Sequence, residues 1–241
     1  MGITQFFTKE EFYTNTDPTE LRAGQICWVP VPNPDPIPRI LDVQRNTPQE
    51  HEQVQFELRM ANREDDFRKR DRSLPIKYLN IRSNEELLVQ TCKKRSAIIL
   101  STEVDCYPNI AKLLRQKGKK HQQQESMFVV PCYSVQVGDY DTGIIQPIVE
   151  RTKCLLYRQF FYLYPCSGKK DLIARFDRVR TVIDKSPASL EPTDVCLSKD
   201  VFNLFLSLFL FCVSGQTNET LEAIKALARE AYPEDLGANR N

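Results

Sequence analysis

Histidine is scarce in this chain, where only His51 and His121 occur among 241 residues. Cysteine is more frequent, with eight residues, but no two of them form a C-x-x-C pair. A zinc-finger site needs such a pair together with suitably spaced histidines or further cysteines, and no such spacing can be written here. The sequence therefore predicts neither a bound metal nor another cofactor.

Long apolar stretches are also missing. The most apolar run, 201–213, has 13 residues, whereas a membrane-spanning helix needs about 20. The run is better suited to a buried helix. The first residues lack the basic-then-apolar pattern of a signal peptide, and several cysteines lie in apolar runs, where they resemble small core residues of a reduced protein. We therefore expect a cytoplasmic protein that makes no membrane contact.

The chain has almost no charge surplus, because 33 Lys and Arg residues oppose 32 Asp and Glu residues, a net charge of +1. No global field favours nucleic acid, so any RNA binding must come from a local patch. Hydrophobic residues make up 41% of the chain, which is typical of a globular core.

Short strand-like runs dominate the pattern of the chain. QVQFELRM at 53–60 alternates polar and apolar residues, which predicts a half-exposed strand. SAIILS at 96–101 and MFVVPCYS at 127–134 are continuously apolar over most of their length and predict buried strands. Helix signals occur mainly at the two ends, in 1–22 and after Ser198. The pattern favours a mostly β, α+β fold, a small barrel with helical caps.

Four segments stand out in chain order: GQICWV at 24–29, KRSAIILS at 94–101, VVPCYS at 129–134 and RFDRVRTVID at 175–184. Together they resemble the MazF/PemK/Kid family of toxins. The resemblance implies an SH3-like barrel over 23–215 with an insertion at about 31–91 and a buried apolar helix. Residues 1–22 would form a helical extension, and 216–241 a C-terminal helix and tail.

The family's usual activity is metal-independent cleavage of single-stranded RNA. By the resemblance, Asp177 matches the general base, Arg175 an arginine that contacts phosphate and acts as acid, and Arg95 a phosphate-binding arginine. Such a reaction needs a base for the 2′-hydroxyl, cations for the phosphate and an acid for the leaving oxygen. Residues 175 and 177 lie two apart on an expected strand, so their side chains would share one face. An ordinary surface ion pair is the alternative interpretation of this Arg-x-Asp pair.

Further substrate-binding residues are expected around these three. Ser134 would hydrogen-bond the scissile phosphate, and Tyr133, which stands where many members have threonine, could stack on a base. Lys94 adjoins Arg95, and the basic stretch 112–121 supplies Lys119 and Lys120 as contacts to the RNA backbone. His51, in the tripeptide His-Glu-Gln found in the first loop of Kid, is a weaker catalytic candidate, because here it falls inside the insertion.

Two functions follow from this interpretation. The first is an mRNA interferase-like endoribonuclease that leaves 2′,3′-cyclic phosphate and 5′-hydroxyl ends, with a cognate antitoxin as partner and a homodimer as a further expectation. The protein would contact DNA only through the antitoxin. The second is an inactive MazF-like module that binds a protein, as a scaffold or sequestering protein in defence or signalling. The second function is favoured by Tyr133, by Ser96 in place of a proline, by the nearly neutral net charge and by the long insertion.

Overall fold

The structure of the 241-residue chain is a computed structural model. It describes residues 2–33, 37–45, 54–62, 64–68, 81–82, 84–102, 105–138, 142–165, 170–183 and 186–230. The chain divides into two compact units, one formed by residues 1–30 and 94–241 and the other by Val31–Lys93. The second unit matches, to within two residues at its end, the range 31–91 that the sequence sets apart as an insertion.

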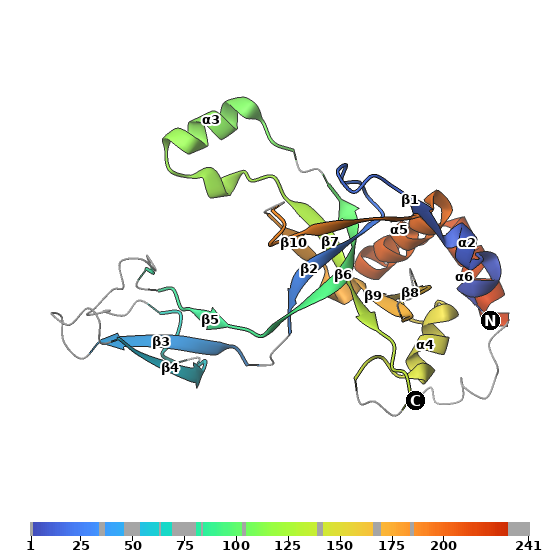
Figure 1. The fold of residues 1–241 in the computed structure, drawn as a ribbon, viewed down its shortest axis with the longest axis horizontal. Helices are drawn as coiled ribbons and strands as arrows, with labels where there is room; N and C mark the ends of the chain where they lie inside the picture. The colour runs from blue at the N-terminus through green and yellow to red at the C-terminus, as the bar shows by residue number, and fades with distance from the viewer. Residues whose placement is uncertain are drawn as a thin grey trace. The chain divides into compact units, whose positions relative to one another are not determined.

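The first unit is α+β, and its strands form one large sheet (Figure 1). Its elements, in chain order, are α1 (Ile3–Phe6), α2 (Lys9–Phe12), β1 (Tyr13–Asn15), β2 (Gln25–Pro32), β6 (Cys92–Ser101), α3 (Pro108–Gln116), the 3-10 turn η1 (Lys120–Gln122), β7 (Met127–Ser134), α4 (Gln146–Lys153), β8 (Phe160–Leu163), β9 (Leu172–Arg175), the 3-10 turn η2 (Phe176–Arg178), β10 (Arg180–Val182), β11 (Glu191–Leu197), α5 (Lys199–Ser214) and α6 (Glu219–Glu230).

The sheet has the strand order β1-β11-β2-β6-β7-β9-β8, and β10 pairs with the first half of β7. Each pair whose register is described is antiparallel. The sheet curls into a half barrel, which confirms the expected α+β class with a large antiparallel sheet. β2 and β6 extend past the boundary into the second unit.

The centre of this sheet consists of the two strands that the sequence predicts to be buried. In β6, Ala97, Ile98 and Ile99 are all fully buried, and in β7 the residues from Val129 to Cys132 are buried as well. Consecutive side chains of a strand point to opposite faces, so a run of buried residues means that both faces are covered. β-Branched residues suit this position because they pack well on a pleated surface.

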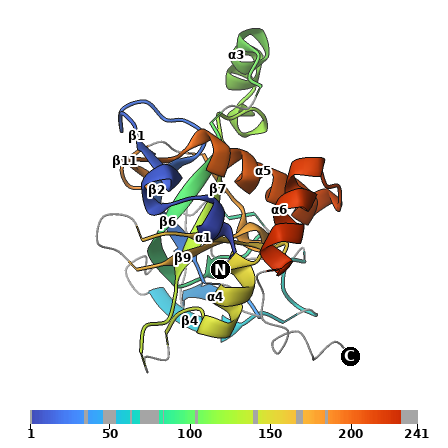
Figure 2. The same cartoon turned by 90° about the vertical axis from the view of Figure 1, so that its right-hand side faces the viewer.

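Helix α5 covers one face of the sheet through an aromatic contact. The ring of Phe205 lies 5.2 Å from Phe161 of β8 and 4.9 Å from Phe176, both edge to face. Figures 1 and 2 show α4, α5 and α6 on the same side of the sheet. The expected buried helix is buried along one face, through Val201, Leu204, Phe205 and Leu208. Leu210 and Val213, near the end of α5, are exposed, because the sheet covers only one face of the helix.

The N-terminal segment 1–22, expected as an extension, is built into the fold. It contains two short helices, but its third element, β1, pairs with β11 at the edge of the sheet. Ile3 and Phe12 are fully buried in the main core. The Phe12 ring packs edge to face on Tyr13 and Tyr164, at 5.0 and 5.2 Å between centroids. The segment is therefore part of the core.

Within the described parts of the chain, no single helix is long and apolar enough to cross a membrane, and α5 with α6 meets those criteria only as a pair bent by 97°.

The cysteines at 27, 92, 106, 132, 154, 196 and 212, in both units, are free thiols. Burial raises the pKa of Cys27 to about 12, so this thiol stays protonated and inert near neutral pH.

We predict that Phe12→Ala destabilises the protein by about 3–5 kcal/mol, because it removes a fully buried ring and leaves a cavity. Chemical denaturation followed by circular dichroism measures the loss. Leu227→Ala, at an exposed position of α6, is the control and should change stability by about 0.5 kcal/mol or less. Equal, small losses in both variants would show that the N-terminal segment does not belong to the core.

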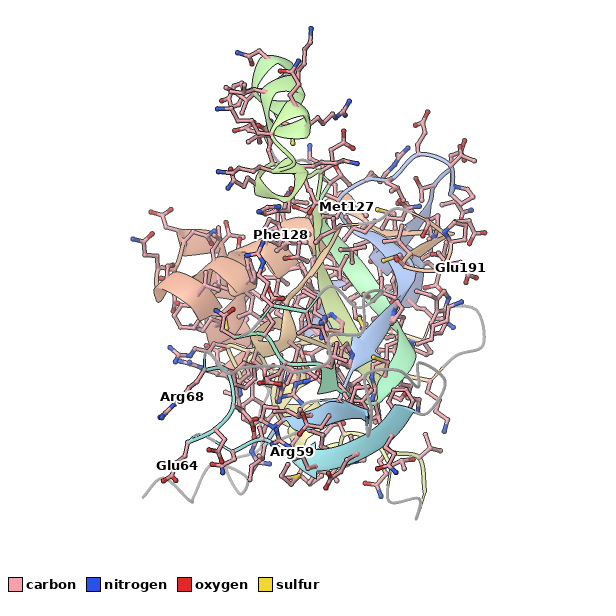
Figure 3. All side chains as sticks on the ribbon, turned by 90° about the vertical axis from the view of Figure 1, so that its left-hand side faces the viewer. Arg59, Glu64, Arg68, Met127, Phe128 and Glu191 are labelled. Carbon is pink, nitrogen blue, oxygen red and sulfur yellow. The ribbon has the colours of Figure 1, made fainter. Side chains whose placement is uncertain are left out.

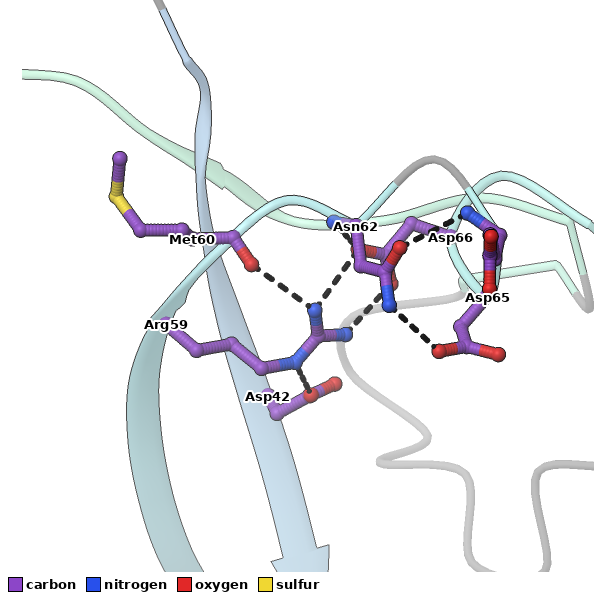
Figure 4. Close-up of polar contacts among 7 residues, drawn as sticks. Asp42, Arg59, Met60, Asn62, Asp65 and Asp66 are labelled. Carbon is purple, nitrogen blue, oxygen red and sulfur yellow. Dashed lines mark hydrogen bonds and ion pairs between the residues drawn. The ribbon is translucent and has the colours of Figure 1, made fainter.

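The second unit contains a three-stranded antiparallel sheet of the order β4-β3-β5, formed by β3 (Arg39–Arg45), β4 (Val54–Met60) and β5 (Leu88–Val89). Arg59 of β4 connects this sheet to the turn that follows it (Figure 4). Its guanidinium donates to Asp42 of β3 and, through two nitrogens at 2.8 and 2.6 Å, to both carboxylate oxygens of Asp66. The Asp66 side chain is fully buried, and it raises the pKa of Arg59.

We predict that Arg59→Leu destabilises the second unit by about 3–5 kcal/mol, because it leaves the buried Asp66 carboxylate without its cation. Hydrogen exchange of the β3 and β4 amides reports this unit separately. Arg82→Leu, which removes only an exposed ion pair with Glu85 in the same unit, should cost about 1 kcal/mol at most. Adding Asp66→Leu to Arg59→Leu should recover part of the loss, and a double variant no more stable than the single one would contradict this account.

Candidate active site

Three neighbouring strands bring Arg95, Tyr133 and Arg175 to one place on the first unit's sheet. In the antiparallel pair of β6 and β7, Ala97 stands opposite Pro131. Continuing this register by two residues, backward along β6 and forward along β7, places Arg95 opposite Tyr133. On the other side of β7, Tyr133 stands opposite Ile173 of β9, and Arg175 follows two residues later. Residues opposite each other, or two residues diagonal, share a face of the sheet. The three side chains therefore project from the same face.

Both guanidinium groups lie against the ring of Tyr133. The Cζ atom of Arg95 is 4.5 Å from the ring centroid, and that of Arg175 is 5.2 Å from it. Arg175 also contacts the ring of Phe160, its partner on β8, at 5.3 Å. Each such contact stabilises a cation by about 0.5–2 kcal/mol, with the larger values where water is excluded. The aromatic rings thus hold two cations close together despite their mutual repulsion.

Asp177 completes the cluster from the turn η2. Two parallel hydrogen bonds run from Arg175 to its carboxylate, Nε to Oδ1 at 3.0 Å and Nη2 to Oδ2 at 2.5 Å. Arg178 approaches the same carboxylate, with its Nε 3.6 Å from Oδ2. The strand β9 ends at Arg175, so the expected strand spacing of residues 175 and 177 is wrong. The 3-10 turn brings the two groups together instead.

The cluster has an excess of positive charge and two unsatisfied donors. Arg175 and Arg178 both approach the carboxylate of Asp177, and Arg95 shares the ring of Tyr133 with Arg175, so three arginines accompany one acid. The Nε atoms of Arg95 and Arg178 are buried and make no hydrogen bond to any described residue. A buried donor without an acceptor costs about 1–3 kcal/mol, a cost that an oxygen-rich anion at this place would remove. The geometry is therefore suited to a phosphate group.

The electrostatics of Arg175 fix its protonation state. The hydrogen-bonded carboxylate of Asp177 raises the pKa of Arg175, against a smaller opposing effect of burial. The guanidinium therefore stays charged at every pH at which the protein is folded. Such a group binds an anion well and releases a proton poorly.

Ser134 and Lys94 do not join the cluster. Ser134 follows Tyr133 in the same strand and stands opposite Leu172, so the pleat directs its side chain to the other face of the sheet. Lys94 is adjacent to Arg95 in β6, so its side chain also points to the other face of the sheet. Its Nζ forms an ion pair with Glu191 of β11, which is labelled in Figure 3. The strand pleat separates both residues from the arginines.

Lys119 and Lys120 lie at the far end of the same hairpin. They belong to the connection that leaves β6 after Ser101 and enters β7 at Met127, and Figure 3 shows this connection rising beyond Met127 and Phe128. Arg95 and Tyr133 lie near the other ends of β6 and β7. The distance from Arg95 along β6 to Ser101, where the connection begins, is about 20 Å at about 3.3 Å per residue. Lys120 instead borders a separate hollow of about 300 Å³ with Arg115 and Glu125.

Two further expectations concern histidine and metals. His51 lies outside the described residues. Within the part of the chain that the structure describes, no group of three or more His, Cys, Asp and Glu side chains could hold a metal ion.

Sequence reasoning missed two members of the cluster, Arg178 and Phe160. Arg178 had a local signal, because it directly follows Asp177 in a segment rich in arginine. Phe160 had none, because its place beside Arg175 depends on the pairing of β8 with β9. The comparisons of this chain with protein-family models, curated proteins and solved structures found no match.

We predict that inorganic phosphate raises the thermal midpoint of the wild-type protein, because a ligand of the folded state stabilises it by mass action. Arg95→Gln and Arg175→Gln should each reduce this shift by more than half. Arg229→Gln, at an exposed position on α6, is the control and should retain it. Sodium chloride at equal ionic strength separates the effect from screening. The same shift in all four proteins would show that phosphate does not bind at this cluster.

Proposed function

We propose that this protein is a metal-independent endoribonuclease of the MazF/PemK kind, acting on single-stranded RNA. The observation that carries the proposal is that Arg95 and Arg175, which come from strands distant in the sequence, both pack on the ring of Tyr133. Asp177 pairs with Arg175 at the same place. RNA cleavage without a metal needs cations at the phosphate and a base at the 2′-hydroxyl. The cluster offers both within one site.

In the proposed complex, the scissile phosphate lies between the guanidinium groups of Arg95 and Arg175. The planar fork of arginine binds two phosphate oxygens at once, and the buried Nε of Arg95 gains an acceptor. The ring of Tyr133 carries both guanidinium groups, so its role here is to position them at the phosphate, and not the base stacking that the sequence suggested. Binding is non-specific at the phosphate, so the sequence preference would come from the bases.

The ion pair between Arg175 and Asp177 must open for cleavage. While Arg175 donates two hydrogen bonds to Asp177, the carboxylate is a poor base. A phosphate that takes over the fork of Arg175 releases Asp177, which can then accept the proton of the 2′-hydroxyl. The 2′-oxygen attacks phosphorus, the bond to the 5′-oxygen breaks, and a 2′,3′-cyclic phosphate forms.

Arg175 serves in this scheme as a clamp and not as the acid. Its raised pKa, caused by Asp177, makes proton release to the leaving oxygen unfavourable. Arg178 beside Asp177 can stabilise the charge that builds on the 5′-oxygen, which then takes its proton from water. This assignment departs from the acid role that the family resemblance implies for Arg175.

The family resemblance also implies a finer fold and a partner. We propose that the curled antiparallel sheet is a divergent SH3-like barrel of the PemK type, with the second unit as an insertion. An antitoxin-like protein would inhibit the enzyme by covering the cluster with an acidic segment. The excess of arginine over acid at the site suits such a segment.

A second candidate function is RNA or protein binding without cleavage. It is favoured by the two hydrogen bonds that hold Asp177 in place and by the position of Ser134 on the other face of the sheet. Tyr133, in place of the threonine of many family members, points the same way. This protein would grip an anionic partner with the same arginines and leave it intact.

We predict that the purified protein cleaves mixed-sequence RNA in the presence of EDTA and leaves 2′,3′-cyclic phosphate ends. Asp177→Asn should reduce the rate by about 100-fold or more, the effect of losing a general base. Asp194→Asn, at an exposed position of β11, is the matched control and should retain the wild-type rate. End-group analysis of the products measures the outcome.

Two further variants test how Tyr133 works. Tyr133→Phe keeps the ring and should retain cleavage, whereas Tyr133→Leu loses the ring against which both arginines pack and should lose RNA binding. Binding of RNA to the wild-type protein without any cleavage would contradict the proposed enzyme activity and support the second candidate function. Cleavage that Asp177→Asn leaves unchanged would exclude the proposed base.

A further inference from the structure

Helix α3 carries apolar side chains that the rest of the fold leaves exposed. None of its residues is buried, and Tyr107, Ile110 and Leu113 are 61, 42 and 44% exposed. Figures 1 and 2 show α3 projecting from the connection between β6 and β7, away from the sheet and from α4, α5 and α6. The turn η1 packs beside the helix, and the side chain of Gln123 donates to the carbonyl of Tyr107 at 3.3 Å.

The sequence divides α3 into an apolar side and a polar side. In a helix of about 3.6 residues per turn, residues three or four apart lie on the same side. This spacing joins Ile110, Leu113 and Leu114, with Tyr107 directly before the helix. Lys112 and Arg115 lie on the other side. A helix with such a pattern normally packs its apolar side on a core, whereas in α3 this side is largely open to solvent.

The positive charge of the chain is concentrated around this helix. Residues 106–124 contain five Lys and Arg residues and no Asp or Glu, a net charge of +5 with His121 neutral, although the whole chain carries only +1. Glu125, just beyond this segment, borders the same hollow as Arg115 and Lys120 and offsets only part of this charge. All five cationic side chains are exposed; they are Lys112, Arg115, Lys117, Lys119 and Lys120.

Exposed apolar side chains beside an excess of cations are suited to the surface of an anionic lipid membrane. Its headgroups attract Lys and Arg, and the acyl layer just below them takes up apolar side chains. Tyrosine is enriched at this boundary because its ring is apolar and its hydroxyl stays in contact with water. RNA would pair with the cations but leave Ile110 and Leu113 in water. A protein partner would need an apolar groove lined with acids, whereas an anionic membrane offers both features over its whole surface.

We propose that α3 and the lysines that follow it attach this protein to anionic lipid membranes. The helix lies in the interface, with Tyr107, Ile110 and Leu113 inserted among the lipids and the cations at the headgroups. The sequence suggested no membrane contact because no apolar run is long enough to span a bilayer, but an interfacial helix needs no such run. The inference is independent of the proposed ribonuclease activity, because the arginine cluster lies near the other end of β6.

Flotation of the full chain with lipid vesicles tests the proposal. Vesicles of phosphatidylcholine with about 40% phosphatidylserine should bind the wild-type protein at least tenfold more strongly than vesicles of phosphatidylcholine alone, and about 0.5 M sodium chloride should release it. Ile110→Gln combined with Leu113→Gln keeps every charge and should weaken binding at least tenfold. The core is unaffected because neither residue is buried. Leu227→Gln, at an exposed apolar position of α6, is the control and should bind like the wild type.

Charge reversals test the electrostatic part. Lys112→Glu combined with Lys117→Glu should weaken vesicle binding at least tenfold. Lys9→Glu combined with Lys199→Glu makes the same change of charge at two exposed positions outside this segment and should have little effect. Arg175→Gln should also retain vesicle binding, which separates this surface from the arginine cluster.

A tryptophan in place of Tyr107 reports insertion directly. On anionic vesicles, the fluorescence emission of Tyr107→Trp should move to shorter wavelengths as the ring leaves water, whereas the wild-type protein, with Trp28 as its only tryptophan, gives the background. Three results would each overturn the proposal: no binding to anionic vesicles, binding unchanged by the two glutamine substitutions, or an unshifted emission. Loss of RNA binding in the lysine variants, without vesicle binding by the wild type, would identify α3 as an RNA contact instead.

Discussion

The candidate site depends on one interaction, the packing of two guanidinium groups on the ring of Tyr133. Arg95 and Arg175 carry the same charge and repel each other. The ring's negative face attracts both, and the carboxylate of Asp177 neutralises one of them. This balance lets the sheet keep a concentrated positive charge in a chain whose net charge is only +1.

The Arg175–Asp177 ion pair gives the site two states in our account. Without a ligand, the pair is closed, and the carboxylate reduces the repulsion between Arg175 and Arg178. With a phosphate bound, the same arginine has a new acceptor, and the carboxylate becomes available as a base. The cost of opening the pair is reduced because Asp177 is partly exposed and Arg178 remains close to it. In a protein-binding role, the arginines would bind an anionic group, and Asp177 would not act as a base.

The sequence predicted the buried strands well and the side-chain directions less well. SAIILS and MFVVPCYS become β6 and β7 because continuous β-branched and apolar runs need cover on both faces. Tyr133 and Ser134 were expected together, but the register separates them, and no local pattern reveals which of two adjacent side chains will face the arginines. From the sequence, residues 1–22 were expected to form a helical extension. Phe12 is buried in the core instead, because β1 pairs with β11, a strand distant in the sequence.

The most direct test of the central claim is a structure of the protein with a non-cleavable dinucleotide that lacks the attacking 2′-hydroxyl. We expect the phosphate oxygens to lie within hydrogen-bonding distance of both Arg95 and Arg175, with Asp177 released from Arg175 and turned toward the sugar. A dinucleotide bound elsewhere on the protein, with the Arg175–Asp177 pair still closed, would contradict it.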